Sequence, residues 1–293
     1  MIDSDPFLSF EEFLLAPLAE VVPLAPQTMI FAAGGTRRSA ALAGVPATGS
    51  EYAQWAYDQM IACFELFFEH GVRHIITHAI IPSQYQEITE NYREQLLNWV
   101  DWVLAGPKAL ASYQRLGWKV RLLGAESLPE LAPVAQRLRE NPAPEQAPTL
   151  WYTITPDEAA PWDVLLDAVH RSGAKTQAQA IRAQFGEDLP PATLYIGSGK
   201  PGVFPAVVPP LLMGKMQCYW TQRPGFILDR ETIRAILYDY AYTRSTWRAD
   251  KTGRAEQVLK DRQIWEQAPI IGLGMRLGPF WYPTSVSDPR DFE

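Results

Sequence analysis

Short runs of β-branched and apolar residues alternate along the chain with longer segments in which apolar residues recur every three or four positions. This alternation is typical of an α/β fold, in which helices cross over between the strands of one mostly parallel sheet. We expect strands at Thr28–Ala33, Val72–His78, Trp118–Leu123, Leu150–Thr155 and Thr193–Ile196, with a sixth at Gln217–Trp220. The sequence therefore predicts an α/β protein with a mostly parallel central sheet flanked by helices.

The clearest helix follows Ser50 and ends before Gly71, a residue type that favours helix termination. Its apolar face is formed by residues spaced four and three apart, namely Tyr52, Ala56, Met60, Cys63 and Phe67. We expect two further helices at Tyr85–Leu104 and Arg230–Tyr242.

We expect a single domain over residues 1–293, with an N-terminal helical extension at 1–25 and a C-terminal tail region at 243–293. In the extension, Ser9 and Glu12 have the spacing of a helix capping box, and acidic residues interrupt the apolar run, unlike a signal peptide or a spanning helix. The proline-rich segment Asn141–Thr149 predicts a loop within the domain, because the strand pattern resumes directly after it.

The formal net charge is −7 and the basic residues are scattered, which argues against a broad nucleic-acid surface and favours a small, local anion site. The two cysteines, Cys63 and Cys218, lack metal-ligand spacing, so we expect a cytoplasmic protein without a disulfide scaffold. Ten tryptophans, twelve tyrosines and twelve phenylalanines can form a core or the walls of a site for an apolar or cationic ligand.

Three of the four histidines, His70, His74 and His78, are spaced by four residues. On one helix they would form a metal-binding face, but Gly71 should end the helix and the following residues are strand-like. Along a strand His74 and His78 would lie roughly 13 Å apart, too far to share one metal. We therefore expect these histidines to be structural or to line a pocket.

The sequence contains no G-x-S-x-G nucleophile elbow, and "IGSGKPG" at Ile196–Gly202 has neither that spacing nor the spacing of a P-loop. Its Gly197–Gly199 turn fits either an anion-binding turn or a plain loop after a strand. A stronger candidate is "FAAGGTRRS". There a strand ends in Gly34 and Gly35 and is followed by Thr36, Arg37 and Arg38 at the sheet edge where α/β proteins bind phosphates.

Four segments, "FAAGGTRRS", "EYAQWAYDQMIACFELFFEHGV", "WKVRLLGAESLP" and "ETIRAILYDYAYTR", resemble the cis-prenyltransferase superfamily over nearly the whole chain. Within it the chain is most similar to the diterpene synthases of the tuberculosinol synthase and kolavelool synthase group. The resemblance implies that the Gly34–Arg38 turn binds diphosphate through Gly34, Gly35, Thr36, Arg37 and Arg38. It also implies that Arg37, Arg38 and Tyr52 are catalytic, with Tyr52 facing the reacting carbon.

The resemblance implies a terpene synthase, a carbon–oxygen lyase or hydrolase that ionises a bicyclic diterpenyl diphosphate of clerodane or halimane type, such as kolavenyl diphosphate, and forms a tertiary alcohol. Two arginines can stabilise the departing diphosphate, and aromatic faces can stabilise the carbocation. We expect the hydrophobic pocket to include Tyr52, Trp55, Tyr92, Trp99 and Trp102, each of which could equally be core. "IGSGKPG" replaces the superfamily's isopentenyl diphosphate clamp, so chain elongation is disfavoured, and the aspartate-rich motifs of ordinary terpene cyclases are absent.

The most consequential departure from the family is Gly34, which occupies the position of an aspartate tied to Mg²⁺. The implied Mg²⁺ would then be held mainly by diphosphate with one ligand such as Asp239 or Glu51, or would be dispensable. Gly34 also fits a non-catalytic supporting subunit, and a third reading is a transferase that passes the terpenyl group to a nucleoside. The resemblance further implies a homodimer, and we expect no integral membrane segment.

Overall fold

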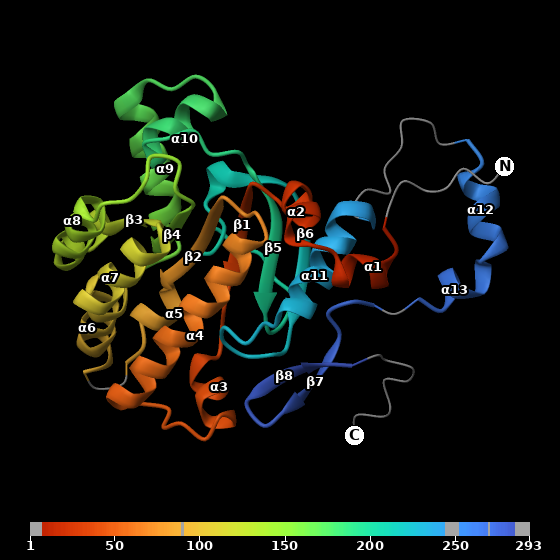
Figure 1. Cartoon of the computed structure of the whole chain (residues 1–293), viewed down its shortest axis with the longest axis horizontal. Coiled ribbons are helices and arrows are strands. Elements are labelled where there is room, and N and C mark those ends of the chain that lie inside the picture. Colours follow the sequence, from red (N-terminus) through yellow and green to blue (C-terminus); the bar gives the residue numbers. More distant parts are fainter. Residues whose placement is uncertain (1–7, 89–90, 244–251, 269, 285–293) are drawn as a thin grey trace.

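The computed structural model describes residues 8–88, 91–243, 252–268 and 270–284, and it is built around one parallel β-sheet (Figure 1). The strands are β1 (Thr28–Ala32), β2 (His74–Ile80), β3 (Lys119–Leu123), β4 (Thr149–Ile154), β5 (Ala192–Ser198) and β6 (Met213–Thr221). Their order across the sheet is β3-β4-β2-β1-β5-β6, and all neighbouring pairs are parallel. The predicted α/β class and all of the predicted strands are therefore confirmed.

Helices cover both faces of this sheet. The helices of the body are α1 (Phe10–Leu15), α2 (Leu18–Val21), α3 (Thr36–Leu42), α4 (Gly49–Glu69), α5 (Pro82–Tyr85), α6 (Tyr92–Ala105), α7 (Pro107–Leu116), α8 (Ala132–Glu140), α9 (Ala160–Ser172), α10 (Gln177–Phe185) and α11 (Arg230–Tyr238). Short 3-10 turns lie at Val22–Leu24, Ala125–Ser127, Pro129–Leu131 and Pro210–Leu212, and a π-helical turn at Asp239–Thr243 extends α11.

Each face of the sheet has its own hydrophobic core, because side chains alternate along the strands. In β1, Met29 and Phe31 join the larger core under α1, α4, α6, α7, α8 and α11. Ile30 and Ala32 join the smaller core under α9 and α10. β1 is thus buried throughout. It lies between the two cores, and its carboxyl end leads into the turn that follows at the edge of the sheet.

The helix predicted after Ser50 is confirmed as α4, whose buried face includes Ala56, Met60, Cys63 and Phe67. The expected continuous helix Tyr85–Leu104 is wrong at its start. The chain instead forms the short α5, and α6 begins only at Tyr92. Asn91, directly before α6, has a φ of 59°, a left-handed conformation that no continuous α-helix contains.

The N-terminal segment is fixed to the body by a buried arginine. Ser9 and Glu12 form the predicted capping box at the start of α1. Arg234 of α11, only 5% exposed, donates hydrogen bonds to the carbonyl oxygens of Phe13, Leu14 and Ala16 at the end of α1. The guanidinium thereby satisfies carbonyl groups that a helix end leaves without partners.

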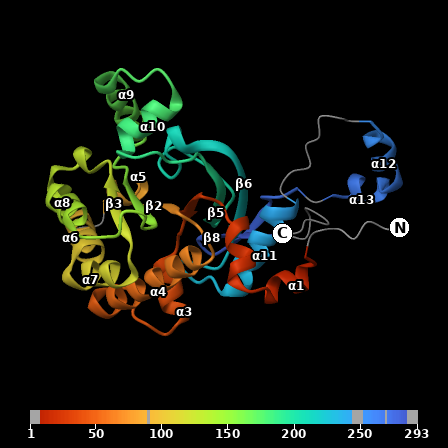
Figure 2. The ribbon, with the colours of Figure 1, turned by 45° about the horizontal axis from the view of Figure 1, so that its top comes forward.

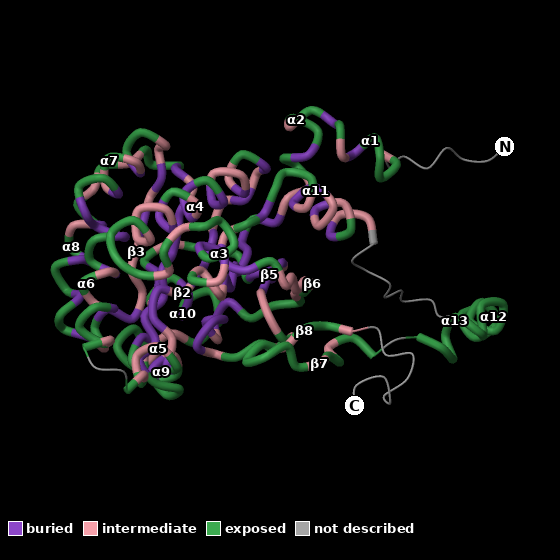
Figure 3. Tube along the Cα trace, turned by 90° about the horizontal axis from the view of Figure 1, so that it is seen from below, coloured by how far each residue is buried: buried purple, intermediate pink, exposed green. Residues whose placement is uncertain are grey.

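The described part of the C-terminal region contains α12 (Arg254–Lys260), α13 (Arg262–Glu266) and an antiparallel hairpin of β7 (Gly274–Leu277) and β8 (Phe280–Pro283). α12 and α13 lie apart from the sheet in two views (Figures 1 and 2), and most of their residues are exposed (Figure 3). The hairpin returns to the body beside α3 (Figure 1). Arg244, the last residue of the quoted segment "ETIRAILYDYAYTR", lies outside the described residues.

Within the described ranges, no helix has both the length and the apolar character needed to span a bilayer.

The lowered pKa values of three histidines lead us to expect that the fold loses stability in mild acid. His74 and His78 lie on β2 as expected, and burial lowers the pKa of each to about 4. Burial also lowers the pKa of His70, whose Nε2 accepts from Arg234 Nε at 3.4 Å. The unfolded chain binds protons at these sites below about pH 6.5, so the free energy of unfolding should fall as the pH drops from 6.5 to 4. The loss should be on the order of 1–3 kcal/mol each for His74 and His78, and His70 should add to it in the same direction.

Thermal or urea unfolding at pH 7 and pH 4.5 measures this loss. His78→Gln should reduce the difference in unfolding free energy between the two pH values, because it removes one group that must stay neutral. His170→Gln, a change at an exposed histidine of α9, is the matched control and should leave the difference unchanged. An equal pH dependence in the parent and in His78→Gln would contradict the prediction.

Candidate active site

A cavity of about 590 Å³ lies at the carboxyl end of β1, beside the first residues of α3 and α4. Its lining residues come from five segments: Gly35–Arg38, Ala47–Tyr52, α5, α6 and β8. They are Gly35, Thr36, Arg37, Arg38, Ala47, Thr48, Gly49, Tyr52, Gln84, Tyr92, Gln95, Leu96, Trp99 and Phe280. This volume is within the range of about 300–1,000 Å³ that is usual for small-molecule sites.

The turn after β1 requires glycine at position 35 for two reasons. Gly35 has a φ of 83°, in the left-handed region that strongly favours glycine. A Cβ atom at this position would also lie 2.5 Å from Arg38 Nη2, because the Arg38 guanidinium is folded against Gly35. α3 begins directly afterwards at Thr36, so Thr36, Arg37 and Arg38 form its first turn.

Each arginine of this turn is stacked on an aromatic ring. The Arg37 guanidinium carbon lies 5.2 Å from the centroid of the Tyr92 ring, and that of Arg38 lies 4.7 Å from the centroid of Phe280. Among the described residues neither arginine forms an ion pair with a carboxylate, and no Asp or Glu lines the cavity. Within the described ranges, the cavity therefore has two positive charges without a paired carboxylate, although the whole chain carries −7.

Hydroxyl and amide groups complete the polar part of the cavity. Thr36 Oγ1 and Tyr52 Oη are 2.7 Å apart and share a hydrogen bond. Burial raises the pKa of Tyr92, against the opposing effect of the Arg37 charge, so this phenol stays protonated at neutral pH. Gln84 Oε1 accepts a hydrogen bond from the backbone N–H of Ile81, which leaves its amide nitrogen as a donor.

The turn is supported from behind by the loop between β6 and α11. Gly225 N donates to Gly34 O at 2.7 Å, and Ser198 Oγ of β5 donates to the same carbonyl at 3.3 Å. Gly34 is therefore part of this support and is not among the residues that line the cavity.

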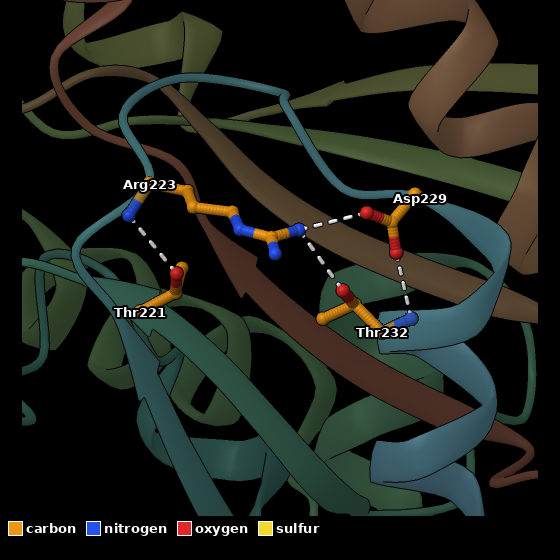
Figure 4. Close-up of polar contacts among 4 residues, drawn as sticks. All are labelled: Thr221, Arg223, Asp229 and Thr232. Carbon is orange, nitrogen blue, oxygen red and sulfur yellow. Dashed lines mark hydrogen bonds and ion pairs between the residues drawn. The ribbon is translucent and has the colours of Figure 1, made fainter.

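The loop itself is held by a compact polar network (Figure 4). Arg223 Nη1 donates to Asp229 Oδ2 at 2.8 Å and to Thr232 Oγ1 at 3.0 Å. Asp229 also caps α11 by accepting from the backbone N–H of Thr232 at 2.7 Å, and Thr221 Oγ1 accepts from Arg223 N. These contacts fix the loop whose Gly225 lies against the strand-end turn.

Of the aromatic residues predicted for the pocket, Tyr52, Tyr92 and Trp99 line the cavity, whereas Trp55 and Trp102 do not. Trp102 lies about one turn beyond Trp99 on α6, where its ring contacts Tyr57 edge-on and is 41% exposed. The cavity does not extend along α6 as far as Trp102. The helical spacing therefore predicted which side of α6 lines the cavity, but not how far along the helix the lining extends.

Several lining residues were not predicted. Gln95 and Leu96 lie three and four residues after Tyr92, so helical spacing alone would have identified them. Gln84 follows the carboxyl end of β2, the same sheet edge as the Gly34–Arg38 turn. Phe280 comes from the C-terminal hairpin, and no local sequence pattern connects it with Arg38.

The residues around the cavity do not fit a protein-held Mg²⁺, which prefers carboxylate oxygens and water. The polar side chains that line it are hydroxyls, amides and arginines. Asp239 Oδ2 accepts from Tyr219 Oη outside the cavity, and Glu51 is exposed in the first turn of α4. No group of three or more His, Cys, Asp or Glu residues suited to a metal occurs in the part of the chain that the structure describes.

No protein-family model matches the chain. Two curated proteins are similar to it over nearly their whole lengths. The chain is 48% identical to the (+)-kolavelool synthase of Herpetosiphon aurantiacus, over 96% of this chain and 98% of that protein. It is 25% identical to the tuberculosinyl adenosine transferase of Mycobacterium tuberculosis, over 94% of this chain and 98% of the relative.

Two solved structures share the fold at low sequence identity. A lavandulyl diphosphate synthase from Lavandula x intermedia superposes with a TM-score of 0.50 at 11% identity, covering 78% of this chain and 98% of its own. A probable undecaprenyl diphosphate synthase from Campylobacter jejuni gives a TM-score of 0.52 at 11% identity, covering 74% and 95%. The chain therefore belongs to the kolavelool synthase family and has the cis-prenyltransferase fold, as the resemblance implied.

Proposed function

We propose that the protein is a diterpene synthase that converts a bicyclic diterpenyl diphosphate into a tertiary diterpene alcohol. The observation that carries this proposal is a cavity lined by Arg37 and Arg38, without a carboxylate partner for either among the described residues. Aromatic and apolar side chains, including Trp99 and Leu96, also line this cavity. The 48% identity to a kolavelool synthase supports this substrate class.

The charges suit cleavage of an allylic carbon–oxygen bond. The electron pair of that bond leaves with the diphosphate oxygen, and the two guanidinium groups stabilise the negative charge that develops there. The carbocation that remains is stabilised by aromatic faces, at about 1–2 kcal/mol per desolvated ring. The oxygen of a water molecule then bonds to the cationic carbon and loses a proton, which gives the alcohol.

We infer that Thr36 and Tyr52 orient the substrate within the cavity that both residues line. Their shared hydrogen bond of 2.7 Å fixes the Tyr52 hydroxyl beside the arginine turn. Because Tyr52 lies on α4 and Thr36 on α3, this bond also fixes the position of one helix relative to the other. We assign Tyr52 the role of holding the reacting carbon next to the diphosphate site.

A second candidate function is transfer of the terpenyl group to a nucleoside. The 25% identity to a tuberculosinyl adenosine transferase supports it, since the same ionisation would precede either capture step. In that reaction a nucleoside nitrogen or oxygen takes the place of water and loses the proton. The first candidate is preferred because the more similar relative is a synthase.

Incubation of purified protein with kolavenyl, halimadienyl and geranylgeranyl diphosphates, with and without adenosine, tests both candidates. Gas chromatography detects the alcohol, liquid chromatography detects an adenosine adduct, and a coupled assay measures released diphosphate. A diterpene alcohol from one bicyclic substrate supports the first candidate, and an adduct in its place supports the second. Binding of diphosphate without turnover of any substrate would favour a supporting subunit.

Chelation of metal ions should leave diphosphate binding intact. The lining of the cavity offers cationic and neutral donors but no carboxylate, so the arginines can hold the anion without a protein-bound metal. Calorimetric titration with inorganic diphosphate should give Kd values within about fivefold in EDTA and in Mg²⁺. Complete loss of binding in EDTA would contradict this prediction and would place a metal-binding group outside the described lining.

A further inference from the structure

We infer that the C-terminal hairpin β7–β8 is a wall of the active site and that Phe280 is a positioning residue for Arg38. Phe280 is separated from Arg38 by most of the chain, yet its ring lies 4.7 Å from the Arg38 guanidinium carbon and lines the same cavity. The effect that we expect Phe280 to have on turnover rests on the proposed function, whereas its expected effect on diphosphate binding does not.

The hairpin has the local features of a defined structure. Four residue pairs, from Gly274–Pro283 to Leu277–Phe280, form its antiparallel ladder. Gly278 has a φ of 57° at the first central position of the two-residue turn, as a type II′ hairpin requires. The Trp281 indole lies over Gly274, where a Cβ atom would come within 2.2 Å of Nε1. Side-chain packing within the hairpin therefore fixes the register that presents Phe280.

The segment leading into the hairpin also lies against the body. Gly272 is adjacent to Pro201, so that a Cβ atom at position 272 would lie 3.7 Å from Pro201 Cγ. Pro201 belongs to the "IGSGKPG" loop after β5, which neighbours β1 in the sheet. Described residues of the tail thus contact both the loop after β5 and the turn after β1.

Arg38 needs such a support because few other groups hold it. Its guanidinium lies against Gly35 and under the Phe280 ring, and no described carboxylate pairs with it. An aromatic face restrains the guanidinium plane and leaves its N–H groups at the edge, where they can donate to an anion. Phe280 is 46% exposed, so this part of the cavity lining is in contact with solvent.

Tyr282 provides a matched control on the same strand. It is 48% exposed, close to the value for Phe280, but it is not among the residues that line the cavity. Phe280→Ala, Phe280→Tyr and Tyr282→Ala are compared by calorimetric titration with inorganic diphosphate, and their melting temperatures verify that each variant folds. Phe280→Ala should weaken diphosphate binding about 3- to 30-fold, whereas Phe280→Tyr and Tyr282→Ala should bind within about twofold of the parent.

The action through Arg38 is tested by a double-mutant cycle. In an Arg38→Ala background, Phe280→Ala should cause no further loss of diphosphate binding, because the group that it positions is absent. If Phe280→Ala binds diphosphate as the parent does, or if its effect is the same with and without Arg38, the inference is overturned. Failure of the parent itself to bind diphosphate would instead overturn the proposed function.

With a turned-over diterpenyl diphosphate, Phe280→Ala should raise KM or lower kcat/KM, and Phe280→Tyr should restore the parent values. If the substitutions instead destabilised the fold in general, both Phe280→Ala and Tyr282→Ala would have lower melting temperatures. Phe280→Tyr would then not specifically restore the parent kinetic values.

Discussion

Replacing Arg38 by alanine should lower kcat/KM by roughly 10- to 150-fold, the effect of losing one charge-assisted hydrogen-bonding group worth about 1.5–3 kcal/mol. Arg37→Ala should cause a loss of similar size, because both guanidinium groups line the cavity without a described carboxylate partner. The double variant should show no measurable release of diphosphate. Steady-state kinetics with the diterpenyl diphosphate that the purified parent protein turns over provides the measurement.

Lysine at either position should recover only part of the activity. An ammonium group restores the charge but not the planar pair of donors that matches two phosphate oxygens. It also lacks the flat face that stacks on Tyr92 or Phe280 in the parent. An Arg38→Lys variant with full activity would show that charge alone suffices at this position.

Arg93→Ala is a matched control for these variants. Arg93 also stacks on an aromatic ring, with its guanidinium carbon 4.0 Å from the Tyr85 centroid, but it is exposed on α6 and does not line the cavity. Its replacement should leave kcat/KM within about twofold of the parent. Equal losses in Arg93→Ala and Arg38→Ala would show that general charge near the site, and not the Gly35–Arg38 turn, governs turnover.

The sheet and the Gly34–Arg38 turn could be predicted because both follow from local pattern. β1 is apolar on both faces, which marks a central parallel strand, and the two glycines with adjacent arginines follow it directly. Parallel strands align their carboxyl ends at one edge, so a turn after a central strand points to the site. The structure brings Thr36 and Tyr52 together at this edge, with their hydroxyl oxygens 2.7 Å apart.

The remaining parts of the site depend on contacts between distant segments. Phe280 reaches Arg38 only because the tail returns to the body, and nothing in the sequence near either residue encodes that return. Trp55 and Trp102 lie three residues beyond the lining residues Tyr52 and Trp99 on α4 and α6, but neither lines the cavity. Side-chain type and spacing therefore predicted which sides of α4 and α6 face the cavity. Tertiary packing decides which residues on those sides line it.

Gly34 also has a structural role that the sequence alone does not indicate. Its carbonyl accepts hydrogen bonds from Gly225 N and Ser198 Oγ behind the turn, and its part in binding diphosphate stays a prediction. A Cβ atom at this position would lie 3.0 Å from Ser198 Oγ, so a larger residue here requires the serine side chain to move. Glycine at position 34 thus leaves room for the Ser198 side chain of β5 beside the turn.

Replacing Gly35 by alanine should abolish most of the activity while the protein stays folded. The left-handed φ of 83° costs an alanine about 1–2 kcal/mol, and the new Cβ would lie 2.5 Å from Arg38 Nη2. The Arg38 guanidinium must then leave its place between Gly35 and the Phe280 ring. We expect kcat/KM to fall about as far as in Arg38→Ala, with a free energy of unfolding lower by about 1–2 kcal/mol.

Gly44→Ala separates the backbone effect from the displacement of Arg38. Gly44 follows α3 with a φ of 72°, and an added Cβ there would meet no atom within 4 Å. Both variants should therefore lose similar stability in urea unfolding, but only Gly35→Ala should lose activity. In an Arg38→Ala background, Gly35→Ala should reduce kcat/KM little further, because the side chain that it displaces is already gone. Full additivity of the two changes would mean that Gly35 acts on the substrate directly and not through Arg38.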